Sequence, residues 1–366
     1  MTPLGRALAD RIRRDGPITV ADYMAACLTD PEHGYYRHAA AVGAAGDFVT
    51  APEISQMFGE LLGLWAAEIW SAIGRPNPIR LVELGPGRGT LMSDALRAAV
   101  KAAPDFRAAI ELHLVEINPT LRLRQAAALA AARPRWHDRF DTVPEGPLIV
   151  LANEFVDAFP VRQFVKSPEG WRERCVGFDE TAQRFVFVPG PRVDTPPVEP
   201  AHATAPDGAV VEVNSAGRAL AAALAQRVTR HGGAALIIDY GAMASGTGDT
   251  LQAVRRHRKV NALEAPGECD LTAQVDFAAL GRAAASAGAA VYGPVPQGIF
   301  LHRLGIAARA ATLLRTAGIR EARAIAAASE RLIGDTGMGM LFKALALTPP
   351  GAPAPPGFDP APSFSR

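Results

Sequence analysis

The segment from Leu81 to Leu91 constrains the fold more than any other part of this sequence. It is an apolar run that breaks into three glycines at alternate positions, Gly85, Gly87 and Gly89, and then continues with helical character. A strand, a tight turn and a helix start in this order present free backbone amides and the positive end of a helix dipole to a nucleotide-like ligand. Isolated glycine patterns are as often plain tight turns. Other residues must therefore decide whether a ligand binds here.

Short apolar segments alternate with helical segments over most of the chain after residue 77. Such alternation indicates an α/β fold with a mostly parallel sheet that helices cover on both faces. The pattern predicts about seven strands, at residues 79–84, 111–117, 135–140, 148–152, 235–240, 289–292 and 342–347. It predicts helices at about 90–102, 119–132, 214–230 and 275–287, with a further helical run over 296–333.

Three parts of the chain depart from this alternation. Helical spacing with turn-rich breaks dominates the N-terminal part, and polar and apolar residues alternate over 161–189 as in an antiparallel ribbon. A Pro-rich stretch then predicts a long surface loop, and the C-terminal tail has so little to bury that we expect disorder. The expected domains are a helical cap or lid at 1–76, a core at 77–165 and 208–348, an inserted ribbon and loop at 166–207, and a disordered tail at 349–366.

Two carboxylates favour one ligand class over another. Glu116 ends the second predicted strand, where an acid can accept hydrogen bonds from both hydroxyls of a ribose. Both NAD and S-adenosylmethionine (SAM) contain such a ribose. Glu83, just before the glycine turn, would repel the pyrophosphate of NAD but attract the ammonium and sulfonium of SAM. The sequence therefore favours SAM, and an NAD-linked oxidoreductase is the weaker alternative. Asp138 is a candidate for contacting the adenine amine, with simple solvation as the alternative.

An acidic loop follows the fourth predicted strand, at the end of the strand where open α/β sheets bind ligands. It contains Asn153, Glu154 and Asp157. Methyl transfer from a sulfonium is a direct displacement, so an enzyme mainly has to place the nucleophile and exclude water. Two carboxylates suit a guanidinium, which binds acids in bidentate fashion and must lose a proton around the transfer step. The alternative, compatible with the first, is that Asn153 caps a short helix whose dipole the acids favour.

Composition narrows the range of partners and sites. Lys plus Arg (38) nearly balances Asp plus Glu (37), which leaves no general field for nucleic acid or an anionic membrane. Cys27, Cys175 and Cys269 are far apart and lack the spacing of a metal site, which is typical of a reduced environment. No run reaches the roughly 18 apolar residues of a membrane span. The N-terminus is rich in Arg, but Asp10 and Asp15 interrupt it, so we expect a cytoplasmic protein.

The chain resembles the MidA-like family of class I SAM-dependent methyltransferases, whose mitochondrial member is an assembly factor of respiratory complex I. The similar segments are HGYY (33–36), GDFVTAPEISQMFGELLG (46–63), ELGPGRGTL (83–91), LVEINPTLRLRQ (114–125), ANEFVDAFPVRQF (152–164), LIIDYG (236–241) and GTLQAVRRHRKVNALEAPGECDLTAQVDF (246–277). The departures are small: Cys269 and Asn261 lie where the family more often has Ala and Asp.

This resemblance implies a Rossmann-like methyltransferase sheet and, for this chain, a bacterial cytoplasmic enzyme. It implies SAM binding at Glu83 to Gly89 with Glu116. It also implies a lid over the cofactor at residues 46–53, which includes Asp47 and Glu53, and a plain structural turn is the alternative for this segment. It also implies symmetric dimethylation of an arginine on a protein, with Asn153 to Pro160 as the acidic active-site motif. A SAM-binding assembly chaperone with little catalysis is the alternative. The basic cluster at 255–259 is either an exposed loop face or a docking site for an acidic partner.

Overall fold

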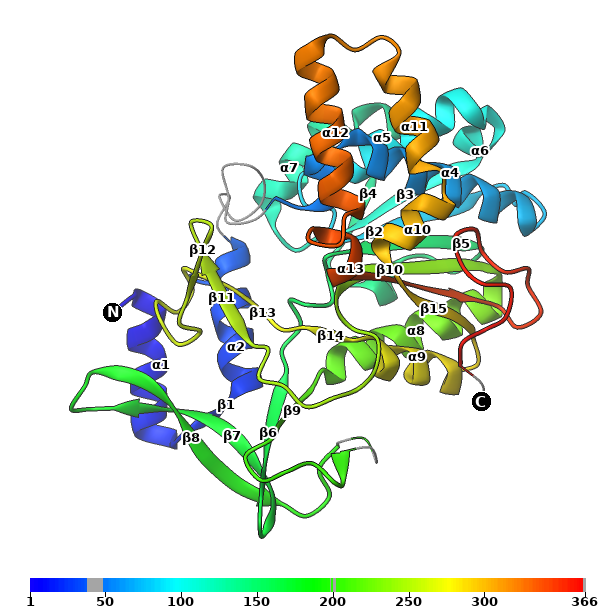
Figure 1. Ribbon diagram of the computed structural model, residues 1–366. Coiled ribbons are helices and arrows are strands. Elements are labelled where there is room, and N and C mark those ends of the chain that lie inside the picture. The colour runs from blue at the N-terminus through cyan, green and yellow to red at the C-terminus, as the bar shows by residue number, and fades with distance from the viewer. Residues whose placement is uncertain (38–48, 198, 200–201, 365–366) are drawn as a thin grey trace. The chain divides into compact units, whose positions relative to one another are not determined.

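The computed structural model describes residues 1–37, 49–197, 199 and 202–364, and these residues form two compact units (Figure 1). The larger unit consists of Val49–Val156, Ala219–Met243 and Phe277–Arg366. The smaller unit consists of Met1–Phe48, Asp157–Arg218 and Ala244–Asp276.

The larger unit is built on a sheet whose main path has the strand order β15-β16-β10-β5-β2-β3-β4. Neighbouring strands from β10 to β4 are parallel, whereas β16 runs antiparallel between β10 and β15. The strands are β2 (Ile79–Leu84), β3 (Ile110–Val115), β4 (Arg135–His137), β5 (Leu148–Asn153), β10 (Gly233–Ala242), β15 (Ala290–Pro296) and β16 (Phe342–Thr348). The predicted α/β class with about seven mostly parallel strands is confirmed.

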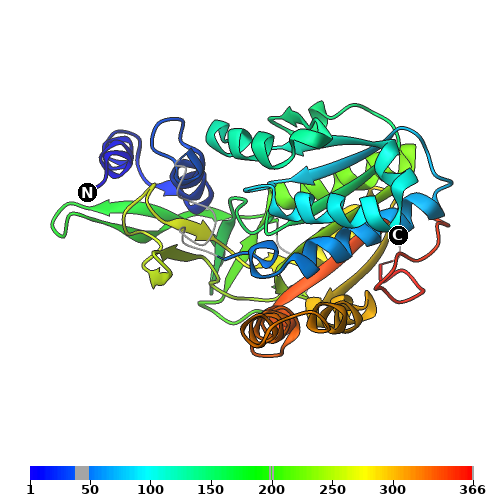
Figure 2. The same cartoon turned by 90° about the horizontal axis from the view of Figure 1, so that it is seen from above.

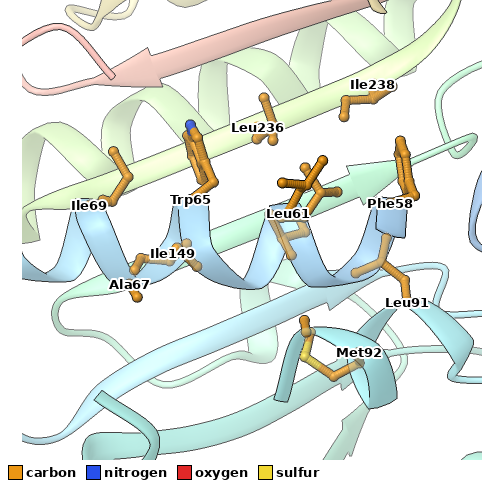
Figure 3. Packing of buried hydrophobic residues seen from close by; sticks show 14 of the residues in the cluster. Phe58, Leu61, Trp65, Ala67, Ile69, Leu91, Met92, Ile149, Leu236 and Ile238 are labelled. Carbon is orange, nitrogen blue, oxygen red and sulfur yellow. The ribbon is translucent and has the colours of Figure 1, made fainter. Parts of the chain in front are cut away.

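Helices cover both faces of this sheet. Helices α4 and α5 lie on one face, and α8 and α9 lie on the other (Figures 1 and 2). Side chains of α4 such as Phe58, Leu61 and Trp65 pack towards Ile149 and Leu236 of the strands (Figure 3). The helices are α3 (Ala51–Ile54), α4 (Gln56–Ala72), α5 (Thr90–Ala102), α6 (Pro104–Ala109), α7 (Pro119–Ala128), α8 (Ser215–His231), α9 (Phe277–Ser286), α10 (Gln297–Arg303), α11 (Ile306–Leu314), α12 (Ile319–Ile333) and α13 (Met338–Leu341).

The smaller unit combines helices with antiparallel sheets. The predicted ribbon is present, as β6 pairs with β7 and β7 with β8 in antiparallel register. Its elements are α1 (Pro3–Asp15), β1 (Ile18–Thr19), α2 (Val20–Thr29), η1 (Tyr35–Arg37), β6 (Arg162–Ser167), β7 (Gly170–Asp179), β8 (Arg184–Val193), β9 (Val210–Val213), β11 (Gln252–Arg255), β12 (Arg258–Val260), β13 (Asp270–Thr272) and β14 (Val275–Asp276). Residues of α1 and α2, among them Leu8 and Tyr23, share a core with Val176 of β7.

The two units divide the chain differently from the expected domains. Residues 49–76, expected in the cap, belong to the larger unit because α4 supplies core residues such as Trp65, which is 1% exposed. Residues 244–276, expected in the core, belong to the smaller unit, where β11 pairs with β12 and β13 in a sheet separate from the central one. Strand β9 likewise pairs with β6.

The C-terminal tail packs where disorder was expected. The indole Nε1 of Trp65 donates a hydrogen bond to the carbonyl of Pro356 at 3.1 Å. The rings of Phe300 and Phe358 lie 5.2 Å apart, and Phe364 forms an antiparallel bridge with Val291. The proline-rich composition suggested a segment with nothing to bury, but two phenylalanines anchor it.

In the part of the chain described, no helix has the length and apolar character needed to cross a membrane.

A buried histidine on β3 pairs with a half-buried histidine on β4. Nδ1 of His113 lies 2.9 Å from Nε2 of His137, whose Nδ1 lies 3.2 Å from the hydroxyl of Thr142. His113 is 0% exposed. Burial, aided by the neighbouring His137, lowers the pKa of His113 from 6.5 to about 4. The pair is therefore neutral in the folded protein at neutral pH.

Acid should destabilise the protein partly through His113. A pKa lower in the folded than in the unfolded chain contributes stability above the unfolded value of about 6.5, and this stability is lost as the pH falls towards 4. We expect a loss of roughly 2–3 kcal/mol in the free energy of unfolding between pH 7 and pH 4.5 from this residue. Urea unfolding of the wild type and of His113→Leu at both pH values measures it. An equal pH dependence in the two proteins would contradict the expectation.

Candidate functional site

Four polar side chains mark the carboxyl ends of four neighbouring parallel strands in the larger unit. They are Glu83 on β2, Glu116 after β3, Asn153 on β5 and Tyr240 on β10. All four share one face of the sheet, because side chains alternate along a strand and the residues two positions earlier face the core that α4 and α5 cover. Those earlier residues are Leu81, Leu114, Leu151 and Ile238. Glu83, Glu116 and Asn153, predicted separately, are therefore brought together at one edge of the sheet.

The glycine turn joins β2 to α5. Gly85, Gly87 and Gly89 all have positive φ, at 64°, 54° and 83°. This left-handed region is open to glycine and costly for other residues. Gly85 also lies close to Phe155, whose ring Cδ2 would be 2.6 Å from a Cβ at position 85. The turn requires glycine at Gly85 for two independent reasons, one conformational and one steric.

Glu83 is a buried carboxyl group with an unsatisfied oxygen. It is 3% exposed, and its Oε2 has no hydrogen-bond partner among the described residues. Burial, and then the negative charge of Glu116, raise the pKa of Glu83 from 4.5 to about 8. The Oδ1 of Asn153 is a second buried acceptor without a partner in the described part of the chain. Two such acceptors on neighbouring strands suit a cationic ligand group that donates hydrogen bonds.

Glu116 is held by the start of α7 and by a residue that the sequence analysis missed. Its Oε1 accepts a hydrogen bond from the backbone of Asn118 at 2.8 Å, and its Oε2 accepts one from Nε2 of Gln125 at 3.2 Å. Gln125 is one of the two buried residues of α7, one helical turn after Leu121. An amide at an otherwise apolar buried helix position was the signal that could have identified it.

The acidic loop begins with Glu154 in a strained conformation. Glu154 has φ of 50°, which is rare outside glycine, and its backbone amide donates to the carbonyl of Ile238 at 2.9 Å. Its Oε1 accepts hydrogen bonds from the amide of Ala51 at 2.9 Å and from Nδ2 of Asn153 at 3.1 Å. Its Oε2 has no hydrogen-bond partner within the described ranges, which leaves one oxygen for a ligand.

The surroundings of Glu154 bring the pKa of its carboxyl group close to 7. Burial of the carboxyl group raises the pKa of Glu154 to about 7, against the lowering effect of the hydrogen bond from Ala51. The negative charge of Asp239 adds to the rise. Asp239 is 0% exposed, and its Oδ2 accepts hydrogen bonds from the amides of Phe155 at 3.1 Å and Val156 at 2.9 Å. Asp239 thus fixes the backbone of the acidic loop.

The segment that starts at Val49 connects the acidic loop to the glycine turn. Besides the bond from Ala51 to Glu154, the carboxylate of Glu53 on α3 accepts a hydrogen bond from the hydroxyl of Thr90 at 2.6 Å. Glu53 also lies 3.6 Å from the guanidinium of Arg88. Sequence analysis placed Glu53 in a lid but did not identify these contacts, which join residues far apart in the chain. Asp47, predicted to contact the cofactor, lies outside the described residues.

Comparisons with known proteins identify the family. Residues 61–295 match the sequence profile described as "Putative S-adenosyl-L-methionine-dependent methyltransferase". The chain belongs to this family of methyltransferases. It is 40% identical to mouse (Mus musculus) protein arginine methyltransferase NDUFAF7, mitochondrial, over 95% of this chain and 85% of the relative. The human protein of that name is 37% identical, over 95% and 84%.

A solved structure supports the same assignment. A Burkholderia thailandensis protein bound to S-adenosylhomocysteine (SAH) matches with a TM-score of 0.83 and 31% identity, over 98% of this chain and 93% of that one. The family resemblance and the dependence on SAM are therefore confirmed, and this methyltransferase is not the NAD-linked oxidoreductase that was the weaker alternative.

The expected location of the methyltransferase is wrong. The sequence analysis predicted a bacterial cytoplasmic protein, whereas the relatives from mouse, fruit fly (Drosophila melanogaster) and human are named as mitochondrial. Balanced charge and three separate cysteines are properties of the folded domain, and they do not distinguish these compartments. The interrupted Arg pattern at the N-terminus was equally uninformative.

The residues at the strand ends fit SAM. The unsatisfied Oε2 of Glu83 can accept a hydrogen bond from the ammonium group, and a positive charge beside Glu83 and Glu116 would offset their mutual repulsion. A phosphate would not stabilise the ionised form of these acids, because its negative charge would raise the pKa of both carboxyl groups further. The chemistry of these donors and acceptors therefore agrees with the family assignment.

The surroundings of Asp157 belong to the smaller unit. Asp157 belongs to the smaller unit, where it is 8% exposed and its carbonyl accepts a hydrogen bond from the amide of Ala273 at 3.1 Å. Burial, and then the charges of Asp270 and Asp157, raise the pKa of Tyr36 well above its ordinary value. The structure does not place Asp157 and Glu154 in one compact unit, so their predicted pairing stays a prediction.

Asp138 and the basic cluster have other partners. Asp138 is exposed and forms a 2.6 Å ion pair with Arg122, so its contact with adenine also stays a prediction. In the basic cluster, Arg255 pairs with Glu268, and the cluster spans the antiparallel turn between β11 and β12. Within the described ranges, no group of three or more histidine, cysteine, aspartate or glutamate residues is arranged to hold a metal ion.

Proposed function

We propose that this methyltransferase transfers a methyl group to the guanidinium of an arginine in a protein. The observation that carries the proposal is Glu154, a partly buried carboxyl group with a pKa of about 7 and an oxygen without a partner in the described part of the chain. The relatives named as protein arginine methyltransferases, which match along most of the chain, support it. The finer prediction is symmetric dimethylation of an arginine on a subunit of a respiratory complex, such as complex I, or on another protein, and it rests on the family resemblance.

In this proposal the strand ends bind the methyl donor. Glu116 accepts hydrogen bonds from the ribose hydroxyls, Glu83 from the ammonium group, and the amides of the turn from Gly85 to Gly89 approach the donor closely. The bound donor supplies a methyl group on a sulfonium, which is transferred by direct displacement. The side chain of Asn153 lies between the two subsites and orients Glu154 by donating to its Oε1.

Glu154 performs two tasks towards the acceptor. Its Oε2 holds one N–H of the guanidinium and so places a nitrogen lone pair in line with the methyl group. A guanidinium nitrogen that forms a new N–C bond must lose a proton, and the carboxylate of Glu154 takes it up. A pKa of about 7 makes Glu154 ionised above neutrality and still basic enough to accept that proton.

Labelling of native proteins tests the acceptor class. Lysate proteins are incubated with the enzyme and SAM that carries an isotopically labelled methyl group, and labelled peptides are sequenced by mass spectrometry. We expect label on arginine side chains of one or a few proteins, as dimethylarginine if the finer prediction holds. A Gly85→Val variant, which should not bind SAM, serves as the control. Label on lysine, on carboxyl groups or only on small molecules would contradict the proposal.

A further inference from the structure

Gln125 lies between the two parts of the proposed SAM site. Its side-chain Nε2 donates one hydrogen bond to the carbonyl of Gly87 at 2.7 Å and another to Oε2 of Glu116 at 3.2 Å. Its Cγ would lie 3.6 Å from a Cβ at Gly89, so it also packs beneath the end of the glycine turn. Gln125 is 0% exposed. One side chain thus joins the turn before α5 to the acid after β3.

The orientation of this amide is determined by Trp136. The indole Nε1 of Trp136 lies 2.8 Å from Oε1 of Gln125. An indole N–H can only donate, so the atom facing it must be the amide oxygen. The NH₂ group then has to face Gly87 and Glu116, and both of its hydrogens are used there. The same reasoning excludes the flipped amide, whose oxygen would face a carbonyl and a carboxylate.

We propose that Gln125 is a positioning residue that aligns Glu116 with the glycine turn and thereby enables recognition of the ribose of the methyl donor. This inference rests on the proposed cofactor site. Glu116 lies beside another buried carboxyl group, Glu83, and burial raises the pKa of Glu116. The donor from Gln125 counteracts that effect, because a hydrogen bond to the charged form stabilises it. Gln125 therefore favours the ionised form of Glu116 and holds one of its oxygens in place, so that the carboxylate can accept from two hydroxyls.

Glutamine is the one common side chain with the required pattern of groups at this position. Glutamate has the same length and can accept from Trp136, but its second oxygen would face the carbonyl of Gly87 and the carboxylate of Glu116. Methionine has a similar volume and flexibility but donates no hydrogen bond. These two substitutions separate the loss of the donor from the addition of a charge.

The test measures binding of SAH and of its analogue that lacks the ribose 2′-hydroxyl, by isothermal titration with the full chain. In the wild type we expect SAH to bind about tenfold more tightly than the analogue, since a site built around a hydroxyl rejects a ligand without it. In Gln125→Met we expect SAH binding to weaken about tenfold or more and the ratio between the two ligands to fall towards one. A variant with weaker binding but an unchanged ratio would overturn the inference, because a general structural defect weakens both ligands equally.

Gln125→Glu adds a pH dependence that a structural defect would not produce. Above the pKa of the new carboxyl group, we expect weak SAH binding because three acceptors face one another. As the pH falls, protonation restores one donor, so the affinity relative to the wild type should rise. A ratio of variant to wild-type affinity that stays constant or falls towards low pH would overturn the inference. This measurement also remains informative if Gln125→Met folds poorly.

Two further variants test the role of Gln125 separately from the proposed cofactor site on which that role depends. Gln297 is also 0% exposed and donates to the carbonyl of Leu332 at 2.9 Å, so Gln297→Met is a matched control that should lower thermal stability and leave SAH binding unchanged. Glu116→Gln tests the site itself. If Glu116→Gln alters neither affinity nor ratio, the proposed cofactor site is wrong. If it alters both and Gln125→Met does not change the ratio, the site stands and the inference fails.

Discussion

Replacing Gly85 by valine is expected to abolish SAM binding, with a rise in the dissociation constant of roughly 100-fold or more. The backbone at Gly85 has φ of 64°, and a Cβ there would lie 2.6 Å from the ring of Phe155. A branched side chain must therefore displace the turn, the ring, or both. The amides of the turn and the unsatisfied Oε2 of Glu83 can then no longer meet the ligand together. Isothermal titration with SAM measures the effect.

Gly74 provides the matched control for this substitution. It has φ of 86° in the same unit, and nothing lies within 4 Å of a Cβ at this position. Gly74→Val should therefore lower the free energy of unfolding by about 1–2 kcal/mol, because valine is strained in the left-handed region as it is at Gly85. It should not change SAM binding. If Gly85→Val binds SAM as the wild type does, the glycine turn is not part of the cofactor site.

Replacing Glu154 by glutamine is expected to lower the rate of methyl transfer about 10²- to 10⁴-fold while SAM binding changes little. Glutamine retains an oxygen for the hydrogen bonds from Ala51 and Asn153, so the loop should keep its conformation. It lacks the negative charge and cannot take up a proton. Rates with an arginine-containing acceptor identified by the labelling experiment, together with titration of SAM, separate the two effects.

The pH dependence of transfer should change in the same variant. The ionised form of Glu154 is the active one in the proposal, so kcat/KM of the wild type should fall as the pH drops below about 7. Glu154→Gln should lack this acidic limb. Glu111→Gln, at the opposite end of β3, is a control that should retain both rate and pH profile.

The same variant distinguishes an enzyme from an assembly chaperone. If Glu154→Gln stops methylation and the acceptor protein then fails to function or assemble, catalysis is the function. If methylation stops while assembly proceeds, holding the partner is the function, and SAM would be a structural ligand. The second outcome would agree with the mechanism proposed for Glu154 but would show that assembly does not require methylation.

The strands of the larger unit could be predicted from the sequence because their burial is simple. A parallel strand covered on both faces is a short continuous apolar run, and Leu148–Asn153 has this character up to Ala152. The assignment of strands to sheets could not be predicted. Val210–Val213 resembles a strand of the central sheet in composition, yet it pairs with β6. The hydrophobic periodicity of a strand indicates which of its faces are buried, but it does not indicate which strand it pairs with.

The tail illustrates the limit of composition as a guide. Residues 349–364 are rich in Pro, Ala and Gly, and on average such segments cannot bury enough apolar surface to become ordered. Here Phe358 packs on Phe300, and Pro356 accepts a hydrogen bond from Trp65. A few anchoring residues with specific partners outweigh the average, and those partners lie far away in the chain.

By itself the sequence determined the fold class, the family, the cofactor and which strand ends carry Glu83, Glu116 and Asn153. The strand ends are local patterns, in which a strand, its turn and the residue at its end are neighbours in the chain, whereas the fold class and the family follow from patterns repeated along the chain. Only the tertiary structure decided that Gln125 joins Gly87 to Glu116 and that Asp239 holds the acidic loop. The physical reason is that hydrogen bonds and burial depend on distance in space. Partners that lie far apart in the chain have no characteristic spacing in the sequence by which they could be identified.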